Sequence, residues 1–63
     1  MNELEALAER LESIVADLDE FAFDRLREAA ADGATTRPSW DRDVTRARRA
    51  AEKAAAILRS VEY

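Results

Sequence analysis

The segment DGATTRPS, Asp32–Ser39, decides how this chain of 63 residues folds. It contains the only glycine and the only proline of the sequence, Gly33 and Pro38. Glycine suits the left-handed conformation just past a helix end, and proline suits the first turn of a helix but not its interior. We therefore expect one loop at about residues 32–38, with a long helix on either side of it.

The residues before this loop have the period of an amphipathic helix over about 3–31. Apolar side chains recur every three or four positions. Asn2 and Glu5 have the N-x-x-E spacing of a capping box, which favours a helix start at this point. The apolar stripe consists of Leu4, Leu7, Leu11, Ile14, Leu18, Ala22 and Ala29, and it is widened by Val15, Phe21 and Leu26.

The residues after the loop show the same period over about 39–61. Ser39 can accept a hydrogen bond from the first turn, and Asp41 and Asp43 complement the positive end of the helix dipole. The stripe consists of Trp40, Val44, Ala47, Ala51, Ala54, Leu58 and Val61, widened by Ala50 and Ile57. A short connection makes antiparallel neighbours of two helices. The sequence thus predicts an all-α fold, an antiparallel two-helix hairpin forming a single domain over residues 1–63.

Large side chains of the first helix should pack against alanines of the second, which lets two helices approach closely. The expected layers are Leu18 with Ala50 and Ala51, Leu11 and Ile14 with Ala54 and Ile57, and Leu7 with Val61. Charged residues on the flanks should select this register, although each exposed pair contributes only about 0–1 kcal/mol. The expected pairs are Glu28–Arg42, Asp24–Arg46 and Asp17–Lys53 on one flank, and Asp19–Arg48 and Glu12–Arg59 on the other.

Arg25 and Asp43 lie inside the two apolar stripes, close to the loop. We expect them to form a partly buried structural ion pair beside Trp40, either within one chain or across a dimer. A small polar binding site is the alternative interpretation of the same two residues.

One hairpin leaves apolar surface uncovered on both shoulders. Ile14, Phe21, Ala50 and Ile57 lie on one shoulder, and Val15, Leu26, Val44 and Ala55 lie on the other, with Phe23 further out. Because exposed apolar patches mark interfaces and twofold symmetry is the commonest solution, we expect a homodimeric four-helix bundle. The candidate interface residues are Ile14, Phe21, Phe23 and Ile57.

Catalytic chemistry has few candidate residues in this sequence. There is no histidine and no cysteine, so the commonest general base and the thiolate nucleophile are missing. The carboxylates fall on solvated flanks opposite arginines. We therefore expect no enzymatic activity, no cofactor and no metal. No apolar run is long enough to span a membrane, so we expect a soluble, cytoplasmic protein.

Three functions stay open at this point. The first is a noncatalytic protein–protein interaction module that self-associates. The second is a small DNA- or RNA-associated regulator using a basic stripe of Arg42, Arg46, Arg49 and Lys53, although the net charge of −4 argues against nucleic acid. The third is an accessory or antitoxin-like subunit that covers an unidentified protein partner.

The segment LEALAERLESIVADLD, Leu4–Asp19, resembles the first helix of exonuclease VII small subunits, which are also short helical hairpins. The resemblance covers a quarter of the chain. The loop DGATTRPSW and the alanine-rich second helix depart from the pattern of that family, so the function of the family is not carried over to this chain.

Overall fold

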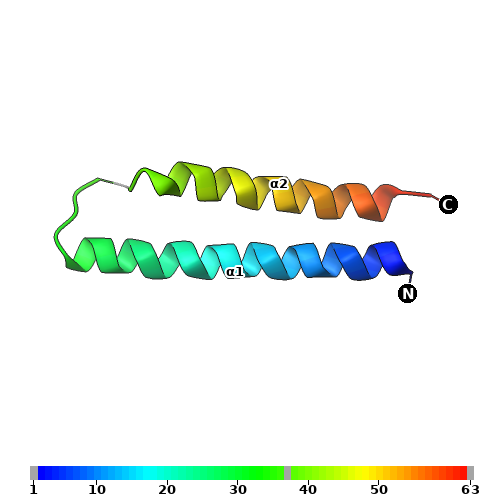
Figure 1. Ribbon diagram of the computed structural model, residues 1–63, viewed down its shortest axis with the longest axis horizontal. Helices are drawn as coiled ribbons and strands as arrows, with labels where there is room; N and C mark the ends of the chain where they lie inside the picture. The colour runs from blue at the N-terminus through cyan, green and yellow to red at the C-terminus, as the bar shows by residue number, and fades with distance from the viewer. Residues whose placement is uncertain (1, 37, 63) are drawn as a thin grey trace.

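The computed structural model describes residues 2–36 and 38–62. Helix α1 spans Glu3–Ala31 and helix α2 spans Trp40–Ser60. The helices lie antiparallel and side by side, so both chain ends lie at one end of the molecule and the loop lies at the other (Figure 1). The expectation of an all-α antiparallel hairpin is confirmed.

The start of α1 is capped by one half of the expected capping box. The backbone N–H of Glu5 donates to Oδ1 of Asn2 at 2.7 Å, and Asn2 itself is extended, with φ −92° and ψ 169°. The other half of a capping box would need the carboxylate of Glu5 to return to the Asn2 N–H. That carboxylate instead accepts hydrogen bonds from Arg59 of α2. The helix start is therefore tied directly to the helix–helix contact.

The end of α1 is a Schellman motif built on Gly33. This residue has φ +90°, a conformation that L side chains rarely adopt. The Gly33 N–H donates to the Ala30 carbonyl at 3.0 Å, and the Ala34 N–H donates to the Ala29 carbonyl at 2.9 Å. These two bonds satisfy carbonyls that the helix itself leaves unpaired. The glycine thus ends α1 where the sequence analysis placed the loop.

The start of α2 lacks the side-chain cap that the sequence suggested. Ser39 has helical backbone angles, φ −61° and ψ −31°, and its side chain makes no capping hydrogen bond. The Asp41 N–H donates instead to the Pro38 carbonyl at 3.1 Å. Such a tight i to i−3 bond is common in the first turn of a helix. The proline supplies the first acceptor of α2, so Ser39 is not needed for this role.

The helix–helix contact includes a row of small apolar side chains on α1 that repeats every seven residues and is buried or half-buried: Ala8, Val15, Ala22 and Ala29. Ala8 is fully buried and Ala55 of α2 is 2 % exposed. The expected layers of Leu7 with Val61 and of Ile14 with Ile57 are not buried, because all four side chains are 41–52 % exposed. The contact is rotated toward the shoulder that contains Val15 and Ala55, since helices approach most closely where their side chains are smallest.

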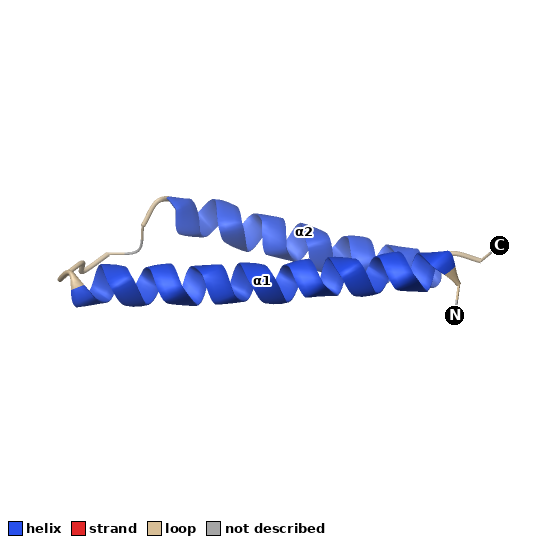
Figure 2. Cartoon of the chain, turned by 60° about the horizontal axis from the view of Figure 1, so that its bottom comes forward, coloured by secondary structure: helices blue, strands red, loops and turns tan. Residues whose placement is uncertain are grey.

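The hairpin is a single layer of helices. Its Cα atoms extend over 52 × 16 × 9 Å. The helices lie closest near the chain ends and separate toward the loop (Figures 1 and 2). Near the loop, the rings of Phe21 and Trp40 pack edge to face with their centres 5.4 Å apart. Within the described residues, no element covers either broad side of this layer.

Candidate interaction surface

The two broad sides of the hairpin differ in chemistry because of two seven-residue rows on α1. One row contains Glu5, Glu12 and Asp19. The other contains Leu7, Ile14 and Phe21, two residues further along in each case. Two residues turn a helix by about 200°, so the rows lie on opposite sides of α1. One side of the molecule is therefore charged and the other is apolar.

The apolar face is defined by Leu7, Leu11, Ile14, Leu18 and Phe21 of α1 and by Ala47, Ala50, Ala54, Ile57 and Val61 of α2. On both helices these residues alternate in steps of three and four, the spacing of a helix packed in a bundle. The five largest side chains away from the helix–helix seam are 41–52 % exposed. The apolar face thus has the residue spacing of a buried core, but in the single hairpin its large side chains are half exposed.

A shallow groove of about 300 Å³ runs across the apolar face. It is lined by Leu7, Arg10, Leu11, Ile14 and Leu58, so both helices contribute to it. Only one of these five side chains is charged. The face is therefore continuous from α1 to α2, and a partner helix lying in the groove would contact both.

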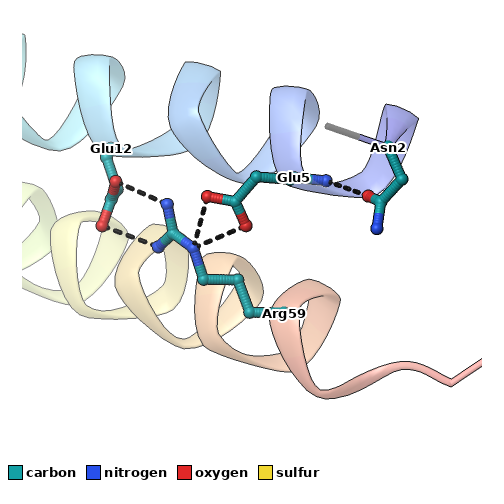
Figure 3. A network of polar contacts seen from close by, with 4 residues as sticks. All are labelled: Asn2, Glu5, Glu12 and Arg59. Carbon is teal, nitrogen blue, oxygen red and sulfur yellow. Dashed lines mark hydrogen bonds and ion pairs between the residues drawn. The ribbon is translucent and has the colours of Figure 1, made fainter.

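The opposite side is the ion-pair face, where two arginines of α2 bind acids of α1. Arg59 donates to both carboxylate oxygens of Glu12 at 2.8 Å, and its Nε donates to Glu5 at 3.0–3.1 Å (Figure 3). Arg48 binds Asp19 through two nitrogens and Glu52 at 2.7 Å. The expected pairs Asp19–Arg48 and Glu12–Arg59 are present, and Glu5 is an additional partner that the sequence analysis missed.

These contacts favour the charged forms of the groups that make them. The hydrogen bond from Arg59 lowers the pKa of Glu12 below its usual value. Hydrogen bonds to Glu12 and then to Glu5 raise the pKa of Arg59, and the hydrogen bond to Asp19 raises the pKa of Arg48. The arginines also border a depression formed with Val15, Ala55 and Ala56. The charges of the ion-pair face are therefore paired with one another, whereas the large side chains of the apolar face have no such partners within the described residues.

Three of the four candidate interface residues lie on the apolar face. Ile14, Phe21 and Ile57 are 49 %, 43 % and 52 % exposed. Phe23 is 62 % exposed and follows Phe21 by two residues, so it lies on the charged side of α1, where its ring is 5.6 Å from the guanidinium of Arg27. The structure also adds Leu7 and Val61, which the sequence analysis assigned to the core. The exact seven-residue spacing of Leu7, Ile14 and Phe21 is the signal that could have identified them.

The candidate ion pair between Arg25 and Asp43 is not formed within the described part of the chain. Arg25 lies 3.4 Å from Glu28, and its guanidinium stands 5.3 Å from the centre of the Phe21 ring. Asp43 lies 3.8 Å from Arg46 in its own helix. Each residue has a neighbour on its own helix instead. Pairing of Arg25 with Asp43 across a dimer stays a prediction.

The basic stripe of Arg42, Arg46, Arg49 and Lys53 lies on the outer surface of α2, and all four residues are exposed. Among the described residues, none of them forms the expected ion pair with Glu28, Asp24 or Asp17 of α1. The helix–helix contact is centred toward the Val15 and Ala55 side, so this flank of α2 lies further from α1 than expected.

Residues 2–36 and 38–62 contain no group of three or more acidic side chains placed to hold a metal ion. No described helix combines the length and the apolar character needed to cross a lipid bilayer.

Comparison with known proteins gives no relative for this chain. No protein-family model matches it, and neither a curated protein nor a solved structure is significantly similar to it. The apolar face is therefore interpreted from its own geometry.

Proposed function

We propose that this chain is a noncatalytic protein–protein interaction module, which self-associates through its apolar face into a homodimeric four-helix bundle. The observation that carries the proposal is the open apolar face of a single-layer hairpin. Stable domains bury their apolar stripes between at least two layers. A second hairpin placed face to face would supply the missing layer.

The dimensions of the hairpin support this proposal. A compact protein of 7.1 kDa exposes about 4,100 Å², whereas this chain exposes 5090 Å². Each partner in an interface of ordinary size buries about 800 Å², which is close to that excess. The radius of gyration is 15.1 Å, against about 11 Å for a compact domain of this length.

Analytical ultracentrifugation of a matched pair of variants tests the proposal. The wild-type chain should sediment as a dimer at tens of micromolar. Ile14→Asp places a charge at the centre of the apolar face, where association would remove it from water, so this variant should sediment as a monomer. Ala16→Asp makes the same charge change about 200° around α1 from Ile14, at an exposed position away from the apolar face, and should leave the dimer intact. A monomeric wild-type chain with the helical circular dichroism of a folded hairpin would refute self-association.

A second candidate function rests on the basic stripe. Because Arg42, Arg49 and Lys53 make no ion pair within the described chain, they could contact phosphates. A gel shift measured across salt concentrations tests this candidate. Binding that weakens steeply with salt and disappears in Arg42→Gln/Arg49→Gln would favour a nucleic-acid-associated regulator. Absence of a shift at low salt would exclude it.

A further inference from the structure

We infer that the second copy docks with its loop at the same end as the loop of the first, so that α1 of each copy packs against α2 of the other. This inference rests on the self-association proposed above and specifies its geometry. Two twofold arrangements can bring the apolar faces together. In the same-end arrangement α1 meets α2 of the other copy, whereas in the opposite-end arrangement α1 meets α1 and α2 meets α2.

Side-chain size on the two halves of the apolar face favours the same-end arrangement. The α1 half is made of leucine, isoleucine and phenylalanine. The α2 half begins with the alanines at 47, 50 and 54 and becomes large only at Ile57 and Val61. Same-end docking gives two equal seams, and each pairs the larger α1 half of one copy with the mostly smaller α2 half of the other, which favours even packing. Opposite-end docking would give one seam made only of the large α1 side chains and another made only of the smaller set on α2.

Charges along the outer edges of the apolar face point the same way. Asp17 follows Ile14 by three positions and Asp24 follows Phe21 by three positions, so both acids border the row of Leu7, Ile14 and Phe21 on α1. On α2, Lys53 borders the face because it follows Ala50 by three positions, and Arg46 borders it because it precedes Ala50 by four. All four charged residues are exposed, and among residues 2–36 and 38–62 none of them pairs across the hairpin.

The register of the hairpin aligns these charges. Two contacts join α1 to α2 directly, Arg48 with Asp19 and Arg59 with Glu12. Because the helices are antiparallel, residue numbers rise toward the loop on α1 and fall toward it on α2. Relative to these two contacts, Asp17 lies at the same height along the hairpin as a residue between 50 and 54, and Asp24 at the same height as one between 43 and 47. Same-end docking keeps these levels between copies, so Asp17 meets Lys53 and Asp24 meets Arg46 of the other copy.

The opposite-end arrangement loses most of this complementarity. In that arrangement the edge of α2 that carries Arg46 and Lys53 would face the same basic edge of the second α2. Lys53 of one copy would then lie close to Lys53 of the other, near the centre of the interface. Arg10 could approach Asp17 of the other α1, but this is a single kind of pair. Like charges brought together destabilise an interface and select against that orientation.

A spin label in the loop distinguishes the two arrangements. The chain has no cysteine, so Thr35→Cys gives one labelling site per copy. Double electron–electron resonance measures the distance between the two labels. In same-end docking this distance should be about one to two helix diameters, roughly 10–25 Å. A distance near the 52 Å length of the hairpin would overturn the orientation while leaving self-association intact. A labelled chain that sediments as a monomer would overturn both proposals.

Charge reversal provides an independent measurement. Asp17→Lys/Asp24→Lys should raise the dimer dissociation constant by about 5- to 100-fold, because four pairs per dimer become repulsive. Adding Arg46→Asp/Lys53→Asp to the same chain should restore the wild-type value. The control Glu9→Lys/Glu20→Lys makes an equal charge change away from the apolar face and should have little effect. Failure of the compensating pair to restore association in a folded chain would overturn the same-end contacts.

Discussion

At the scale of single residues, Arg59 has the densest set of polar contacts in the hairpin. Its guanidinium joins Glu5 and Glu12, which stand two helical turns apart on α1. The two hydrogen bonds to Glu12 are parallel, the geometry in which arginine binds a carboxylate most strongly. Because Glu5 also marks the capped first turn, one side chain of α2 fixes both the register of the hairpin and the start of α1.

The lowered pKa of Glu12 predicts a loss of stability in acid. A carboxyl group with a lower pKa in the folded chain stabilises that chain above its unfolded pKa, near 4.5, and loses this contribution as pH falls through the folded value. Glu12→Gln should therefore reduce stability at neutral pH and flatten the fall in melting temperature below about pH 4.5. Thermal melts from pH 7 to pH 2 measure this.

Glu9→Gln is the matched control for that experiment, since Glu9 lies on the same helix and makes no ion pair among the described residues. It should keep the pH profile of the wild-type chain. Identical profiles for Glu12→Gln and the wild type would show that the contact with Arg59 does not contribute to stability in solution.

Charge pairing was predictable from the sequence only on one flank. Spacing at 100° per residue was enough to pair Asp19 with Arg48 and Glu12 with Arg59. The same reasoning failed for Asp17, Asp24 and Glu28, because it assumed a contact centred between the flanks. The contact is instead centred closer to the ion-pair face, so one set of pairs forms and the other does not.

At the scale of the helices, the small-residue row on α1 controls how closely α2 approaches. Ala8 is fully buried, so a larger side chain there must push the helices apart or leave its preferred rotamer. We expect Ala8→Leu to lower the free energy of unfolding by about 1–3 kcal/mol. Ala16→Leu makes the same change at an exposed position of α1 and should alter stability by less than about 0.5 kcal/mol. Urea denaturation of both variants measures the difference.

A stabilising effect of Ala8→Leu would contradict the close approach at this row. The loop and the helix ends were easier to predict than this row, because Gly33 and Pro38 act through their own backbone restrictions. The centre of the helix–helix contact depends on the sizes of side chains that meet across space. Several neighbouring apolar rows share the same period on α1, and only the three-dimensional packing selects among them.

At the scale of the whole molecule, folding and association should be coupled. The hairpin buries only small side chains completely, and no large one among the described residues is fully buried. Covering the exposed half of each large side chain on the apolar face contributes about 1 kcal/mol per residue. The melting temperature should therefore rise with protein concentration, by mass action. Circular dichroism melts from about 2 to 200 μM test this, and a constant melting temperature would show that the hairpin is stable alone.

The apolar face itself was predicted only in part. Phe21 and Ile57 widened the expected stripes, and Ile14 lay both in the stripe of the first helix and on its shoulder, so all three were named as interface candidates. Leu7 and Val61 were assigned only to the stripes, because nothing in a single sequence says which side of a leucine-rich helix faces its neighbour. The sequence nevertheless predicted that apolar surface would stay uncovered, because a chain this short forms only one hairpin.

The position of both chain ends at one end of the hairpin determines how the molecule responds to mechanical force. Pulling residues 2 and 62 apart opens the helices from that end, so the contacts load one after another instead of all together (Figure 1). The hydrogen bonds of Arg59 to Glu5 and Glu12 would be stretched and broken first, and the contact between the rings of Phe21 and Trp40 would break last. A hairpin stretched in this way unzips at low force, whereas the same pair of helices pulled from opposite ends would have to shear along its whole length.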